Sequence, residues 1–68
     1  MVNNDMKKLI PMKDLKKQVS LSSTTIYKMV KDGIFPKPII LQNTRIAWVD
    51  QEIEAWINQK IEERDIAI

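Results

Sequence analysis

Apolar residues recur at helical spacing in the first half of the chain. Met12, Leu15 and Val19 follow the i, i+3, i+7 pattern, which predicts a short helix over about residues 12–18. A helix of two turns is too short to be stable alone, so it must pack against the segment that follows. The next two residues, Ser20-Leu21, are expected to form a tight turn.

A second helix is predicted over about residues 22–32. Ser22 suits its N-terminal cap, because the hydroxyl can accept a backbone N–H of the first turn. Gly33 suits its end, where a left-handed residue commonly closes a helix. Two short helices joined by a tight turn form the helix-turn-helix pattern, whose turn often contains glycine. This turn has Ser20 instead, and a positive φ there would cost about 1 kcal/mol.

The middle of the chain predicts an extended linker and a β-hairpin. The segment 34–38 contains two prolines and cannot be helical. The β-branched run 39–41 and the alternating run 45–48 predict two strands. They are separated by a three-residue loop, Gln42-Asn43-Thr44, in which Asn43 tolerates a left-handed conformation.

The last part of the chain predicts a helix over about residues 50–64. Asp50 is expected to cap it, and acidic residues follow in its first turn, where the helix dipole favours negative charge. Phe35, Trp48 and Trp56 are expected in the core, because so small a core needs large apolar side chains.

These elements together predict an α+β fold, a small winged helix-turn-helix in which the hairpin is the wing. Leu9 and Ile10 are long enough to add a short strand before Pro11. We expect a flexible arm at residues 1–8, one domain over 9–65, and an apolar tail at 66–68.

Charge is distributed unevenly along the sequence. Residues 6–48 carry a net charge of +7, whereas residues 49–68 carry −4, although the whole chain carries only +2. A basic front and an acidic rear would attract a polyanion to one side and orient its approach. The alternative is chance combined with tuning of the helix dipoles.

Several classes of chemistry are excluded by composition. The chain has no cysteine and no histidine, so it has no thiolate or imidazole metal ligands and no nucleophile paired with histidine. Its one glycine rules out a glycine-rich phosphate loop. No apolar run is long enough for a membrane span and no signal-type segment is present. We therefore expect a cytoplasmic, nucleoid-associated protein that is not an enzyme and has no cofactor.

The predicted second helix has two contrasting faces. One side is apolar, and the other carries hydroxyl groups and cations from Thr24, Tyr27, Lys28 and Lys31. The major groove of DNA admits an α-helix and offers hydrogen-bond acceptors and phosphates to such a face. The alternative is an ordinary surface helix whose lysines keep the protein soluble, and this stretch alone does not decide between them.

The predicted hairpin loop also carries suitable donors. Gln42, Asn43, Thr44 and Arg45 can all reach phosphates or base edges next to a recognition helix. An ordinary exposed loop is the alternative, and we favour contact with DNA because of the neighbouring helix.

Four sequence elements occur together in this chain: the helix sequence 21–30, the G-x-F-P-x-P element 33–38, and the segments 45–48 and 54–57 around the two tryptophans. Together they resemble the AlpA-type regulators, small prophage and mobile-element proteins that are related to excisionases and have a MerR-like winged helix-turn-helix. The resemblance covers roughly residues 9–60 and implies sequence-specific DNA binding, as a transcriptional regulator or as an architectural factor for prophage excision. It places the recognition helix on Ser23 to Lys31 and the wing on Gln42 to Arg45.

The chain departs from that pattern in two places. Ser20 stands where these proteins often have glycine in the turn, and the wing tip lacks the usual glycines.

We predict that double-stranded DNA is the partner, with further copies of the chain on DNA or a phage integrase as candidate additional partners. Ser23 and Thr24 are expected at base edges, Lys28 at a base or phosphate, Tyr27 and Lys31 at phosphates, and Gln42, Asn43, Thr44 and Arg45 at the wing contact, with non-specific attraction from Lys13, Lys16 and Lys17. The rival function is a protein-interaction adapter or anti-repressor that uses the third helix and the tail at 66–68.

Overall fold

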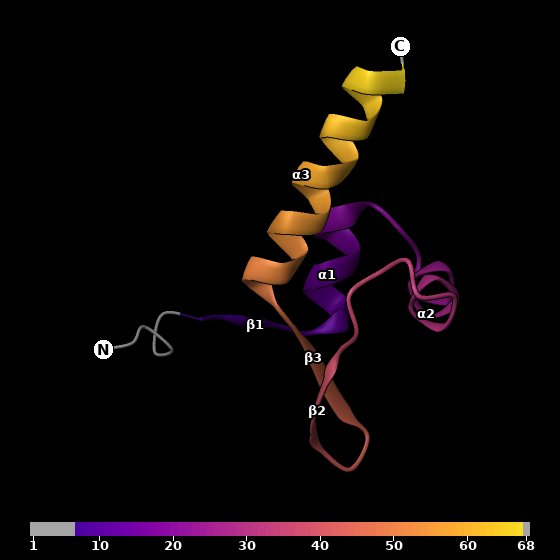
Figure 1. Ribbon diagram of the computed structural model, residues 1–68. Helices are drawn as coiled ribbons and strands as arrows, with labels where there is room; N and C mark the ends of the chain where they lie inside the picture. Colours follow the sequence, from indigo (N-terminus) through magenta and orange to yellow (C-terminus); the bar gives the residue numbers. More distant parts are fainter. Residues whose placement is uncertain (1–6, 68) are drawn as a thin grey trace.

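Residues 7–67, which are the residues that the structure, a computed structural model, describes, form three helices and three short strands (Figure 1). The order of elements confirms the predicted α+β winged helix-turn-helix. Their bounds are β1 Leu9–Ile10, α1 Met12–Val19, α2 Ser23–Lys31, β2 Ile39–Gln42, β3 Arg45–Val49 and α3 Asp50–Ala67.

The last helix is longer than the sequence predicted. It continues to Ala67 instead of ending near residue 64, because no glycine or proline interrupts it and good helix-forming residues fill its last turns. It also begins at Asp50, directly after β3, so Asp50 lies in its first turn rather than at the predicted capping position. The backbone N–H of Asp50 donates to the carbonyl of Lys8 at 2.8 Å.

The predicted arm and tail lie at the edges of what is described. Residues 1–6 of the arm and Ile68 of the tail lie outside the described residues. Ile66 and Ala67, which we assigned to the tail, are the last two residues of α3, and Ile66 is 83% exposed.

The sheet is antiparallel and has the order β1-β3-β2, so β3 pairs on both edges. Leu9 lies opposite Val49 in the first pair of strands. In the second pair Gln42 lies opposite Arg45, so the loop has two residues, Asn43 and Thr44, and not the predicted three. A bulge between Ile40 and Gln42 accommodates the shorter loop. Asn43 has the predicted left-handed conformation, with φ 50°.

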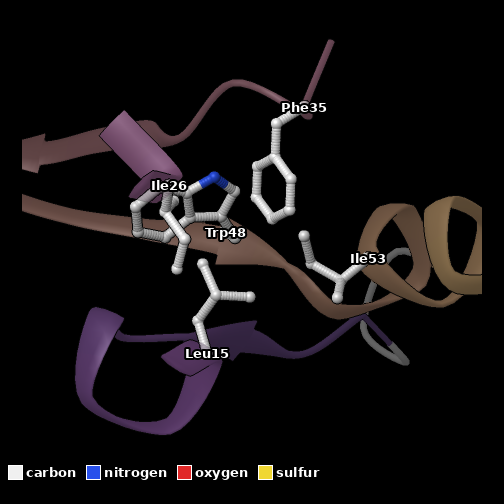
Figure 2. Close-up of a cluster of buried hydrophobic side chains, with 5 residues drawn as sticks. All are labelled: Leu15, Ile26, Phe35, Trp48 and Ile53. Carbon is white, nitrogen blue, oxygen red and sulfur yellow. The ribbon is translucent and has the colours of Figure 1, made fainter. Parts of the chain in front are cut away.

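The core joins all the main segments. It is formed by one buried side chain from each of α1, α2, the linker, β3 and α3, and Figure 2 shows these side chains pointing toward one another: Leu15, Ile26, Phe35, Trp48 and Ile53. Trp48 and Phe35 are buried in the core, as predicted. Trp56 packs against this cluster but is partly exposed. No single element could bury its apolar side alone, so the fold depends on their simultaneous packing.

The turn between α1 and α2 stores backbone strain. Ser20 has φ 60° and ψ 40°, the left-handed conformation, and its N–H donates to the carbonyl of Lys16 at 2.9 Å. A side chain with a Cβ is unfavourable in this conformation. Glycine would therefore fit better than serine at this position, where α1 ends.

Ser20→Gly is expected to raise the free energy of unfolding by about 0.5–1 kcal/mol, because the relief of left-handed strain exceeds the added entropy of the unfolded chain. Urea unfolding measures this change. Asn43→Gly is the control, since asparagine already tolerates φ 50° and the gain there should be smaller. Equal stability of Ser20→Gly and the original protein would contradict the strain argument.

Candidate nucleic-acid interface

The start of α2 is fixed by a side-chain cap. Ser22 is extended, with φ −76° and ψ 159°, and its Oγ accepts the backbone N–H of Thr25 at 3.2 Å. The same Oγ lies 3.0 Å from the Thr25 hydroxyl oxygen. These contacts confirm the predicted cap and satisfy a donor that the first turn would otherwise leave free.

The end of α2 is closed by a double hydrogen bond. The N–H of Gly33 donates to the carbonyl of Val30 at 3.1 Å, and the N–H of Ile34 donates to the carbonyl of Met29 at 3.0 Å. Gly33 has φ 79°, so this is a Schellman motif with glycine at its left-handed position. Both ends of α2 are therefore defined by local chemistry, as the sequence predicted.

The two faces of α2 differ in burial as predicted. Ile26 is fully buried, whereas Tyr27 is 51% exposed. The other candidate side chains on the outer face, Thr24, Lys28 and Lys31, are exposed, and Ser23 is half-buried. Ser23 is thus the least accessible of the proposed contacts on this helix.

The cations of α2 are available to an external partner. Within residues 7–67 the ion pairs both lie on α3, between Lys60 and Glu63 and between Arg64 and Asp65. The sequence of α2 contains no carboxylate. Its positive charge is therefore not neutralised by an acidic side chain of its own helix.

The wing tip projects from the body of the molecule, away from the C-terminal half of α3 (Figure 1). All four candidate residues there are exposed: Gln42, Asn43, Thr44 and Arg45. Lys13, Lys16 and Lys17 of α1 are exposed as well. The structure thus leaves every proposed basic group on the surface and none in the core.

The sequence did not reveal how the linker between α2 and the wing is held. The indole N–H of Trp48 donates to the carbonyl of Pro36 at 2.8 Å, and the indole N–H of Trp56 donates to the carbonyl of Ile34 at 3.0 Å. Between these two carbonyls Phe35 is buried, and its ring meets that of Trp56 edge-on, with centroids 4.7 Å apart. The sequence predicted both tryptophans only as apolar anchors of the core.

Comparison with protein families gives a match over most of the chain. The family model described as "Prophage CP4-57 regulatory protein (AlpA)" matches residues 8–61. The chain belongs to the AlpA family. The AlpA match runs from β1 through most of α3 and so includes α2, the linker and the wing.

A phage protein is also similar to this AlpA family member. It is "Uncharacterized protein ORF88" of Enterobacteria phage P4, which is 37% identical over 41 residues. That alignment covers 60% of this chain and 47% of the phage protein, so the chain spans about half the length of this relative.

Family membership confirms the coarser part of the functional prediction. The family to which the chain belongs is described as a prophage regulatory protein, a description that names regulation and no catalysed reaction. In residues 7–67 no helix is both long and apolar enough to cross a bilayer.

Ser22→Ala is expected to lower the free energy of unfolding by about 1 kcal/mol, because it removes the acceptor for the Thr25 N–H. Ser22→Asn is the matched control, since asparagine caps helices about as well as serine. Denaturant titration followed by circular dichroism measures both variants. If Ser22→Ala unfolded at the original midpoint, the cap would contribute nothing to the stability of α2.

Proposed function

We propose that this AlpA family member is a sequence-specific DNA-binding regulator. Helix α2 lies in the major groove, and the wing loop contacts the adjacent backbone or minor groove. The observation that carries the proposal is the contrast across α2, which buries Ile26 and exposes Thr24, Lys28 and Lys31. A helix supported from behind, with hydroxyls and cations in front, offers the groups that base edges and phosphates accept.

Each side chain of the interface has an expected role. Thr24 and Ser23, at the N-terminal end of α2, approach base edges, and the long side chain of Lys28 reaches a base or a phosphate. Tyr27 and Lys31 bind phosphates. At the wing, the guanidinium of Arg45 anchors the loop on a phosphate or in the minor groove, where its planar fork of donors is suited to such acceptors.

The charge distribution supports the same orientation. The segment 6–48, with a net charge of +7, contains α1, α2 and the wing, whereas the segment from 49 onward, with −4, contains α3. The basic part is drawn toward DNA and the acidic helix is repelled from it. Lys13, Lys16 and Lys17 add attraction that does not depend on base sequence.

The biological role within this function has two forms. The protein either regulates transcription or shapes DNA as an excisionase-type architectural factor, and an integrase or further copies of the chain would then bind beside it. Selection of binding sites from a random oligonucleotide pool gives the motif and the number of half-sites together. A neighbouring integrase gene would favour the excision role.

A protein-interaction adapter is the second candidate. It is favoured by exposed apolar side chains on α3, since Ile61 is 43% exposed and Ile66 is 83% exposed. An adapter would bind DNA weakly and with little dependence on salt, whereas the proposed DNA-binding protein would bind with a steep salt dependence.

Lys31→Ala is expected to weaken binding to all DNA sequences alike and to reduce the magnitude of the salt slope by about 0.9, because one phosphate contact is lost. Gel shifts at several salt concentrations measure this slope. Arg64→Ala is the matched control, since it removes the same charge from the acidic helix α3. An equal loss in both variants would mean that net charge alone matters, and Lys31 would then not be a contact.

Thr24→Ala is expected to flatten the preference among DNA sequences while leaving the salt slope unchanged, because a neutral contact to a base edge releases no counterion. The selected motif of the variant, compared with that of the original protein, tests this outcome. An unchanged motif would remove Thr24 from the set of base-reading residues.

A further inference from the structure

Helix α2 is joined to the rest of the protein by few groups. Its backbone does not pack closely along any other element, and its one fully buried side chain is Ile26. Met29 and Val30 in its last turn also pack against the core, but both are only partly buried. A further attachment at this end of the helix would hold its outer face in a constant register on DNA.

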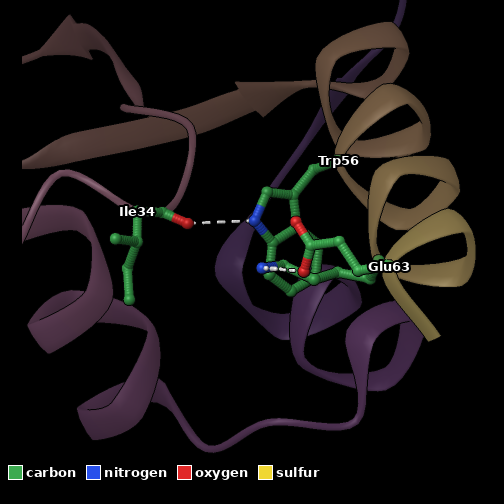
Figure 3. A network of polar contacts seen from close by, with 4 residues as sticks. Ile34, Trp56 and Glu63 are labelled. Atoms are coloured by element: carbon green, nitrogen blue, oxygen red, sulfur yellow. Dashed lines mark hydrogen bonds and ion pairs between the residues drawn. The ribbon is translucent and has the colours of Figure 1, made fainter. Parts of the chain in front are cut away.

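A chain of hydrogen bonds supplies this second attachment. The N–H of Ile34 donates to Met29 in the last turn of α2, and the carbonyl of Ile34 accepts the indole N–H of Trp56 in α3. Figure 3 shows the Trp56 side chain directed from α3 toward the Ile34 carbonyl. Ile34 thus bridges the end of α2 to the side of α3.

The Trp56 ring is itself held on two sides. Phe35 meets it edge-on with an interplanar angle of 64°. The ammonium of Lys60 lies 5.4 Å from its ring centroid and pairs with Glu63 at 3.2 Å (Figure 3). Contacts of this kind restrict the ring without depending on its N–H.

The wing is attached to the same linker from the other side. Trp48 lies in β3, which is the second strand of the hairpin and the central strand of the sheet, and it donates to the carbonyl of Pro36, two residues beyond Ile34. The two indole donors therefore hold neighbouring points of one short segment, one from the wing and one from α3. This segment is also the covalent connection between α2 and the wing.

We propose that Trp56 is a positioning residue for DNA recognition: its N–H sets the orientation of α2 relative to the wing through the Ile34 carbonyl. The proposal rests on the proposed DNA-binding function. The side chains of a binding site must be held within about 0.5 Å of their productive positions by the groups around them. Loss of this bond loosens the last turn of α2, so the base contacts lose register while the phosphate attraction persists.

The bond is suited to a test because it lies where solvent can reach it. Ile34 is 54% exposed, so water can replace the indole donor and the carbonyl is not left unsatisfied. Trp56→Phe keeps an aromatic ring beside Phe35 and removes only the donor and part of the ring. Its thermal stability should therefore change little.

The ratio of specific to non-specific affinity is expected to fall roughly three- to tenfold in Trp56→Phe, the range expected for one lost hydrogen bond, with an unchanged salt slope. Hydrogen exchange at the Ile34 amide should become faster at the same time. Glu63→Gln is the matched control, because it removes the ion pair with Lys60 but retains the cation beside the ring, the Phe35 contact and the Trp56 donor. This control should have the same affinity ratio and the same exchange rate at the Ile34 amide as the original protein.

If Trp56→Phe kept the ratio of specific to non-specific affinity that the original protein has, the proposal would be overturned. If that variant failed to fold, a tryptophan analogue at position 56 with sulfur in place of the N–H provides the same comparison with the shape retained. In the original protein, a Trp56 indole proton that exchanges as fast as that of free tryptophan would also overturn it. If the original protein selected no DNA motif, the DNA-binding function would fail, and exchange at the Ile34 amide would still decide whether Trp56 holds the end of α2.

Discussion

The burial of Trp48 is the constraint on which the rest of the structure depends. It lies in the central strand, fully buried, and touches a core to which α1, α2, the linker and α3 each add one buried side chain. Its indole N–H would be costly to bury without a partner, and the carbonyl of Pro36 accepts it at 2.8 Å. The largest core residue therefore packs the core and also fixes the path of the linker.

Local rules define each element, and the shared core places them. Ser22 begins α2 and Gly33 ends it, but neither residue decides which way the helix faces. Ile26 decides this, because its burial turns Thr24, Lys28 and Lys31 outward. The face that α2 exposes to a partner is therefore determined by the side of the helix that packs in the core.

The acidic and basic parts of the chain have different positions in the fold. Six of the eleven basic residues lie on α1, α2 and the wing, and α3 carries six of the nine acidic ones along a helix that extends beyond the sheet (Figure 1). Only the first half of α3, with Ile53 and Trp56, is needed for the core. Its second half is free of that requirement, which is why it exposes Ile61 and Ile66.

The sequence by itself determined both short helices, the hairpin, the tolerance of Asn43 for a left-handed conformation and the polar face of α2, because each follows from neighbours within about one turn or one loop. It left the positive φ at Ser20 as a condition, which the structure shows to be met. It placed the end of α3 too early and gave the wing one loop residue too many, since strand pairing across the bulge sets that loop. Only the tertiary structure decided what the tryptophan N–H groups bind. Their acceptors lie 12 and 22 residues away in the sequence, and no local pattern records a hydrogen bond between segments that meet only after the core has formed.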